Sequence, residues 1–214
     1  MRVFLVTIFG LGLCAEAAFS ATAWDESANG DLSTDPFSPT NVSLEVGANT
    51  VQGTVVTATD TRDYLTFDVG PGRLLTNIVL TDYLDVTDPA NPVPGNRGFV
   101  ALDDGSTSAV PTGGTIGEFL GGDHLDAADV GNDLLAQLAL APLGGSGFTT
   151  PLGEGTYTLL VQQTGPQVSA YGLELTVVPL PGALPLFGGA LAWLGFKRWR
   201  QTSRKLGPTE RSGG

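Results

Sequence analysis

The sequence predicts a mainly β protein: a single jelly-roll-like β-sandwich with one short helix, flanked by an N-terminal signal peptide and a C-terminal transmembrane helix. Three observations predict this organisation. The 214 residues include 30 Gly and 14 Pro, and only 15% are charged, which is typical of short strands joined by tight turns. Several segments alternate apolar and polar residues, the period of a half-buried strand. Each end of the chain also carries an uncharged apolar stretch.

The first residues have the organisation of a secretory signal peptide. Met1-Arg2 is a short positive region, residues 3–13 are apolar, and small residues follow. We expect cleavage after Ala23, within Ala21-Thr22-Ala23, so that residues 1–23 are removed after passage through the Sec translocon. The element Ala15-Glu16-Ala17 satisfies the same small-x-small rule and is the alternative.

The only cysteine of the chain, Cys14, lies inside this leader. It follows Leu13, where a lipobox has a small residue, so we interpret Cys14 as part of the apolar region; a lipid-modified N-terminus is the alternative. The exported protein is therefore expected to contain no disulfide. Its stability must come from core packing or from bound ions.

Residues 24–177 are expected to form the exported domain, a length sufficient for one hydrophobic core. Residues 24–40, rich in Asp, Asn, Gly and Pro, predict an irregular lead. Strands are expected where alternating segments lie between turn residues; these are 41–46, 50–57, 64–69, 74–81, 98–102, 155–163 and 168–178. Gly53 predicts a bulge in the second of them.

Residues 123–141 change period. Their apolar residues approximate helical spacing; they are Leu125, Val130, Leu134, Leu135 and Leu138. Asp129 or Asn132 is a suitable N-cap. We therefore expect one short helix at 131–139, lying over one end of the sandwich.

The segment Asp63–Ile78 predicts two strands joined by the turn Gly70-Pro71-Gly72. Its pattern of Asp, aromatic, apolar, x, Phe, x, Val, then a turn and Leu-x-x-Ile, resembles bacterial pre-peptidase C-terminal-type β-sandwich modules. The resemblance implies a jelly-roll-like binding or accessory domain, not an enzyme.

The C-terminal stretch has no charged residue between Glu174 and Lys197. An apolar run of roughly 20 residues fits the ~30 Å hydrocarbon core of a bilayer, and a following basic cluster marks the cytoplasmic end. We expect a transmembrane helix at 182–196, the basic cluster at 197–205 and a disordered cytoplasmic end at 206–214. The cluster contains Lys197, Arg198, Arg200, Arg204 and Lys205.

Three interpretations of this tail are open: a buried core helix, a permanent single-pass anchor, and a sorting tail that is recognised and cut. The motif Val178-Pro179-Leu180-Pro181, the apolar run and the Arg-rich end together resemble the PEP-CTERM sorting signal of Gram-negative bacteria over residues 177–200. The family's usual motif is Val-Pro-Glu-Pro, and Leu180 replaces its charged residue. The resemblance implies an inner-membrane-anchored precursor, processing by an exosortase-type membrane protease, and a final place at the cell surface or in the extracellular matrix.

The exported domain is strongly acidic. The whole chain has a formal net charge of −12 at pH 7, and Arg62, Arg73 and Arg97 are the only basic residues between Trp24 and Pro181. Such a surface repels nucleic-acid phosphates, so nucleic-acid binding is excluded. Divalent cations are its natural counter-ions.

The sequence offers little for catalysis. His124 is the sole histidine and no cysteine follows Cys14, which excludes a Cys/His dyad and a His-rich zinc site in the exported part. The segment 144–148, Gly-Gly-Ser-Gly-Phe, lacks the final glycine of a Gly-x-Ser-x-Gly elbow. We expect a non-enzymatic protein, with a carboxylate pair for glycoside hydrolysis as the enzymatic alternative.

One acidic run predicts a calcium site. Asp123, Asp126, Asp129 and Asp133 supply the oxygen ligands that Ca²⁺ prefers. Asp60-x-x-Asp63 and Asp103-Asp104 are further acidic pairs. The alternative interpretation is that these are solvated acidic loops and that the protein has no cofactor.

Two classes of function follow. The tail implies an exported cell-surface or extracellular-matrix protein with a non-enzymatic structural or adhesion role linked to exopolysaccharide. The alternative is a carbohydrate- or calcium-binding module held by a permanent single-pass anchor. An exposed aromatic row on one face would favour carbohydrate binding; its candidates are Tyr64, Tyr83, Tyr157 and Tyr171.

Overall fold

The computed structural model describes residues 20–85, 97–109, 116–165 and 168–180. The chain divides into two compact units, Met1–Val178 and Pro179–Gly214, and almost everything described belongs to the first. The leader up to residue 19, the expected membrane helix at 182–196, the basic cluster at 197–205 and the chain end at 206–214 lie outside the described residues. Within the described part, no helix has both the length and the apolar character needed to cross a bilayer.

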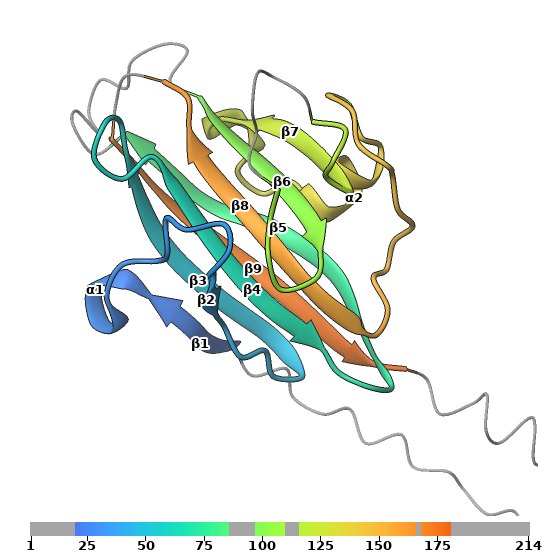
Figure 1. Ribbon diagram of the computed structural model, residues 1–214. Coiled ribbons are helices and arrows are strands. Elements are labelled where there is room, and N and C mark those ends of the chain that lie inside the picture. The colour runs from blue at the N-terminus through green and yellow to red at the C-terminus, as the bar shows by residue number, and fades with distance from the viewer. Residues whose placement is uncertain (1–19, 86–96, 110–115, 166–167, 181–214) are drawn as a thin grey trace, which may run out of the picture. The chain divides into compact units, whose positions relative to one another are not determined.

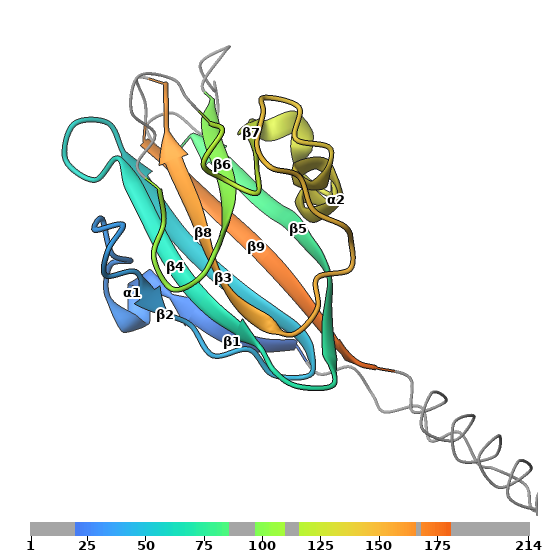
Figure 2. The ribbon, with the colours of Figure 1, turned by 45° about the vertical axis from the view of Figure 1, so that its right-hand side comes forward.

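The described strands form two sheets (Figures 1 and 2). Sheet A has the order β1-β3-β9-β5; its strands are β1 Ser20–Asp25, β3 Gly47–Val56, β9 Val168–Pro179 and β5 Arg73–Asp85. Sheet B has the order β2-β4-β8-β6-β7; its strands are β2 Thr40–Asn41, β4 Arg62–Val69, β8 Gly155–Gln163, β6 Gly98–Asp104 and β7 Gly121–Leu125. The prediction of a mainly β sandwich is confirmed.

Among the described residues, three short helical segments accompany the sheets: α1 Glu26–Asn29, the 3-10 helix η1 Ala127–Asp129, and α2 Leu134–Ala139. Helix α2 packs against β5 and β7 and buries Leu134, Leu135 and Leu138, so the expected helix is present. Its N-cap is Asp133, whose side chain accepts a hydrogen bond from the Leu135 amide, rather than Asp129 or Asn132.

The core lies between the sheets. Antiparallel pairing of β3 with β9 and of β4 with β8 aligns apolar residues on the inner faces. Val51, Leu65, Phe67, Leu159 and Leu173 are fully buried there. Each such side chain contributes about 1.5–3 kcal/mol, so burial at the sheet interface is the main source of stability for this chain.

The structure corrects three expectations. Residues 41–46 do not form a strand: only β2 pairs, in parallel with β4, although Val42 and Leu44 are buried as the alternation requires. Gly53 does not form a bulge, because the β3–β9 register runs unbroken through it. The irregular lead begins with regular structure instead, since β1 pairs in parallel with β3. This pairing joins distant segments and leaves no local signature.

Candidate metal centre

The segment after β1 folds back on itself and thereby positions an acidic side chain. Asp25 caps α1, accepting hydrogen bonds from the Ser27 amide at 2.9 Å and the Ser27 hydroxyl at 2.7 Å. The indole N–H of Trp24 donates to the Gly30 carbonyl at 3.1 Å, and Gly30 has φ 91°, a conformation that favours glycine. The single helical turn therefore ends at once and the chain reverses.

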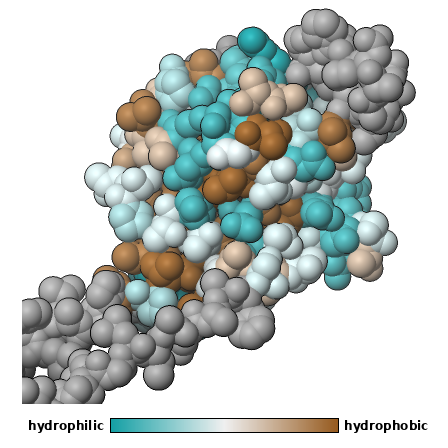
Figure 3. Space-filling view, turned by 180° about the vertical axis from the view of Figure 1, so that it is seen from behind, coloured by the Kyte–Doolittle hydropathy of each residue, from teal (hydrophilic) through white to brown (hydrophobic). Residues whose placement is uncertain are grey.

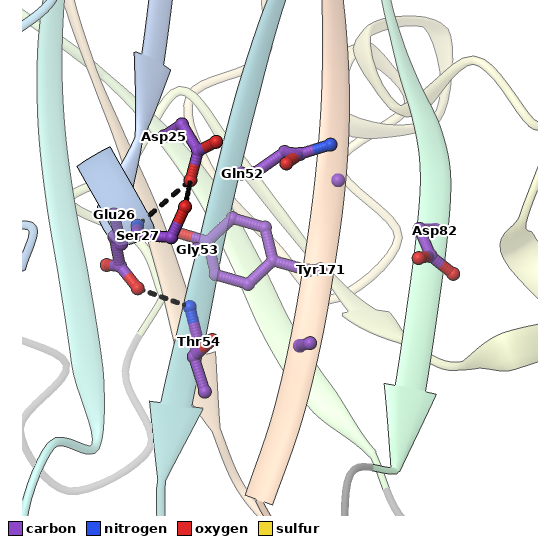
Figure 4. Close-up of a pocket in the computed structure, with 10 residues that line it drawn as sticks. Asp25, Glu26, Ser27, Gln52, Gly53, Thr54, Asp82 and Tyr171 are labelled. Carbon is purple, nitrogen blue, oxygen red and sulfur yellow. Dashed lines mark hydrogen bonds between the residues drawn. The ribbon is translucent and has the colours of Figure 1, made fainter. Parts of the chain in front are cut away.

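Glu26 joins this folded segment to both neighbouring parts of the chain. One carboxylate oxygen accepts from the Leu32 amide at 3.1 Å, and the other accepts from the Thr54 amide of β3 at 2.7 Å; Figure 4 shows the second bond. Further along, the Ser33 carbonyl accepts from the Tyr64 amide of β4 at 2.8 Å. Residues 26–33 thus form a strap from sheet A to sheet B.

Three carboxylates meet beneath this strap. Glu26, Asp31 and Asp63 each offer an oxygen, and these oxygens all lie within 4.8 Å of one another. Asp63 belongs to β4 and is completely buried. The Tyr171 hydroxyl donates to its Oδ2 at 2.7 Å, whereas Asp63 Oδ1 is buried without a hydrogen-bond partner. A buried carboxylate oxygen without a donor is energetically costly.

Asp60 extends this acidic group. Its Oδ1 is also buried and unpartnered, and its electrostatic interaction with Asp31 shows that the two side chains are close. No Lys or Arg in the described part of the chain forms an ion pair with Glu26, Asp31, Asp60 or Asp63; the ion pair found there joins Arg97 to Asp126. When these four groups are ionised, no Lys or Arg of the described residues balances their charge through an ion pair.

The pKa values of three of these carboxyl groups are raised, chiefly by burial. Burial raises the pKa of Asp63 to about 9; the hydrogen bond from Tyr171 opposes the rise, and the charges of Glu26, Asp60 and Asp31 add to it. Burial likewise raises the pKa of Glu26 to about 7, against the hydrogen bonds from two amides. For Asp60, burial and then the charge of Asp31 raise the pKa to about 6. Burial and neighbouring like charges both disfavour the ionised form of a carboxyl group, and burial is the larger cause for all three groups.

A hollow of about 260 Å³ lies beside the cluster. Figure 4 shows its walls: Asp25, Glu26 and Ser27 on one side, Gln52 and Thr54 of β3, and Asp82 of β5. The Tyr171 ring lies across Gly53, where a Cβ would collide with it. Gly53 is thus required for Tyr171 to reach Asp63. Elsewhere, hydrophilic and hydrophobic residues are interspersed on the back of the molecule (Figure 3), as on an ordinary protein surface.

This donor set fits a hard divalent cation. Ca²⁺ takes six to eight oxygen ligands at about 2.3–2.6 Å, so two ligands on opposite sides of one ion are roughly 5 Å apart. The 4.8 Å limit within the Glu26, Asp31 and Asp63 group meets this condition. No histidine or cysteine contributes to the group, which disfavours zinc.

The acidic run predicted to bind calcium is used differently. Asp126 and Asp129 cap η1 reciprocally, Asp133 caps α2, and Asp123 accepts from the His124 amide at 2.7 Å. Among the described residues, the condition of three mutually close acidic oxygens is met by Glu26, Asp31 and Asp63 rather than by these four. His124 itself is exposed on β7.

Of the other predicted site residues, Ala21, Ala23, Val178, Pro179 and Leu180 are described by the structure. Ala21 and Ala23 belong to β1. Val178 and Pro179 end β9 and Leu180 is exposed, while Pro181 and the basic residues from 197 onward lie outside the described residues. The four tyrosines proposed as an aromatic row are all buried: Tyr64, Tyr83, Tyr157 and Tyr171 are 0%, 4%, 9% and 2% exposed.

Two of the four carboxylates of this centre are visible in the sequence as an acidic pair. Asp60-x-x-Asp63 stands out as an acidic pair, but Glu26 and Asp31 fall in the expected irregular lead. The available signal was Asp25-Glu26 followed by Asn29-Gly30-Asp31, an acidic turn immediately before a buried leucine.

No family model matches the chain. A search of curated proteins found no match either. Among solved structures, the chain is similar to the pre-peptidase C-terminal domain of a collagenase from Bacillus anthracis, with 14% sequence identity and a TM-score of 0.33. The match covers 64% of this chain and 92% of that domain.

Proposed function

We propose that this protein is an exported, calcium-binding, jelly-roll-like β-sandwich with a structural or adhesive role at the cell surface, and that it is not an enzyme. One observation carries the proposal. Three carboxylate oxygens lie within 4.8 Å of one another, and one of the three side chains, Asp63, is fully buried with an oxygen that has no partner.

The carboxylates of this centre favour the binding of a cation. Closely spaced carboxylates repel one another, and burial strengthens the repulsion because the local dielectric constant is low. A bound divalent ion converts the repulsion into attraction and supplies the partner that Asp63 Oδ1 lacks. Mg²⁺ is a weaker candidate than Ca²⁺, since it demands near-ideal octahedral geometry at about 2.0–2.1 Å.

Export gives the ion a role. The only cysteine lies in the leader, so an exported form without the leader has no disulfide to stabilise it. A ligand that binds only the folded state adds stability, about 4 kcal/mol at 1,000 times its Kd. Calcium bound beneath the strap would hold residues 26–33 against both sheets, in the place that a disulfide takes in other secreted domains.

The test is a calcium titration of the full chain, purified in detergent, by isothermal titration calorimetry. Wild type should bind Ca²⁺ in preference to Mg²⁺, and Asp63→Asn should weaken the binding by roughly 100-fold, about 2.7 kcal/mol. The matched control is Asp68→Asn on the same strand, because Asp68 is exposed and an Asn oxygen can still accept from Thr156. Equal affinity in Asp63→Asn and wild type would refute the proposal.

The C-terminal tail supports sorting by an exosortase-type membrane protease, with a permanent single-pass anchor as the second candidate. Intact mass of the exported protein from its native host, with and without the protease, separates the two. A mass that ends near Pro181 only when the protease is present supports sorting and release to the surface or matrix. A mass that retains residues 182–200 in both hosts supports the permanent anchor.

The main argument for carbohydrate binding does not hold, because the four tyrosines proposed as an exposed aromatic row are buried. Exopolysaccharide remains a proposed partner through the tail's resemblance alone. It is tested by co-sedimentation of the released protein with the host's matrix, with and without calcium.

A further inference from the structure

We propose that the leader is cut after Ala17, so that the mature protein keeps the whole of β1. The proposal rests on the export proposed above but not on the cation. Two elements of the sequence satisfy the small-x-small rule, Ala15-Glu16-Ala17 and Ala21-Thr22-Ala23. They differ in what they leave behind. A cut after Ala17 leaves β1 intact, and a cut after Ala23 removes four of its six residues.

The residues that a cut after Ala23 would remove belong to sheet A. Ser20, Ala21 and Thr22 pair in parallel with Ala48, Asn49 and Thr50 of β3, and after a bulge Trp24 and Asp25 pair with Val51 and Gln52. The Thr50 hydroxyl also donates to the Ala21 carbonyl at 3.4 Å. Residues 20–22 are therefore part of a strand of the folded domain. Residues left over from a signal peptide would not be expected to pair with a strand of the domain.

Loss of β1 would also expose β3. Sheet A has the order β1-β3-β9-β5, so β1 covers one side of β3 with backbone hydrogen bonds (Figure 1). A cut after Ala23 removes the partners of Ala48, Asn49 and Thr50, so this part of β3, Gly47–Val56, becomes an unpaired sheet edge. Long unprotected edges pair with other chains and promote aggregation. Ala23 and Trp24 also pack against the main hydrophobic core, and a cut between them would place a charged ammonium group there.

β1 also fixes the position of Glu26 at the start of the strap. β1 ends at Asp25, whose amide donates to the Asn29 side chain at 3.1 Å, and Glu26 follows directly. With β1 paired, Glu26 is fixed beside the Thr54 amide. With a new terminus at Trp24, only Trp24 and Asp25 would precede Glu26, and their pairs with Val51 and Gln52 would be all that is left of the β1–β3 pairing.

The experiment is the mass and N-terminal sequence of the exported full chain in its native host. We expect Ala18 as the first residue. A first residue beyond Ser20, Trp24 above all, overturns the proposal.

Two matched variants identify the element that is used. Ala15→Leu and Ala21→Leu place the same bulky side chain at the same position of the two elements. Ala15→Leu should accumulate uncut precursor and Ala21→Leu should not, which is read on the precursor and so does not require that the variant fold. The opposite pattern overturns the proposal.

A second measurement tests why the strand matters. Full chains that begin at Ala18 or at Trp24, made without the leader, are compared by thermal unfolding in EDTA and in calcium. The shorter chain should have a lower Tm in both buffers. Equal Tm values would overturn the argument from β1. The two proposals fail separately: an N-terminal Ala18 with no calcium binding sinks the cation site alone, and an N-terminal Trp24 with calcium binding sinks the processing site alone.

Discussion

The Asp63→Asn variant should be more stable than wild type without calcium and less stable than wild type with calcium. Asp63 is fully buried, and its pKa is raised from an ordinary value of 3.8 to about 9, mainly by burial. At pH 7 the side chain is thus protonated in the cation-free fold and ionised in the unfolded chain. Folding must then take up a proton, at a cost of about 1.4 kcal/mol for each pH unit above 3.8.

The magnitude follows from that interval. pH 7 lies about three units above the ordinary pKa, so the ionisable group costs the cation-free fold up to about 4 kcal/mol. Asn has nearly the shape of the protonated acid, can still contact Tyr171, and does not ionise. Without calcium, Asp63→Asn should therefore be the more stable protein. With calcium, wild type gains binding free energy that the variant has lost, and the order should reverse.

Urea unfolding of the full chain in detergent at pH 7 measures the free energy of unfolding in EDTA and in calcium. Tryptophan fluorescence is the signal, because Trp24 lies at the end of β1 next to the strap. Asp68→Asn serves as the control and should not change the order in either buffer. If Asp63→Asn is less stable than wild type in EDTA as well as in calcium, Asp63 acts only as the hydrogen-bond partner of Tyr171, and the reasoning is refuted.

Three other outcomes are expected. In EDTA the protein should lose stability as pH rises from about 4 towards 9, because Asp63, Glu26 and Asp60 all have folded-state pKa values above their ordinary values and such groups favour folding only while protonated; saturating calcium should flatten this profile in thermal melts, and a profile unaffected by calcium would contradict the site. Gly53→Ala should cost about 1–3 kcal/mol in urea unfolding, since the new Cβ meets the Tyr171 ring, and an unchanged midpoint would mean that the ring is not held there. Leu180→Glu introduces the charged residue that the usual form of the proposed sorting motif carries, and it should raise the processed fraction seen by intact mass in the native host; no increase would show that Leu180 does not limit processing.

Alternation and turns were sufficient to predict most of the sandwich. β8 begins and ends where expected, at Gly155 and Gln163, because nine residues of uninterrupted strand pattern lie between clear turns. β1 could not be predicted in this way. Its partner in β3 is distant in sequence and runs parallel, and its first residues look like the end of a leader.

The candidate metal centre was harder to predict for a related reason. The densest acidic run, residues 123–133, has the spacing of helix caps, and its carboxylates accept bonds from nearby amides as capping residues do. The carboxylates that do gather come from positions 26, 31 and 63. They meet because the strap crosses from one sheet to the other, a tertiary feature without a local pattern.

The position of β9 has a mechanical consequence. β9 lies between β3 and β5 in sheet A, and its last residues lead into the C-terminal tail. A pull on that tail would act along the strand and load the ten residue pairs that join β9 to β3 together, in shear, rather than opening them one after another. If the domain is held at the cell surface through this tail, as proposed, attachment through a central strand would resist traction better than attachment through an edge strand.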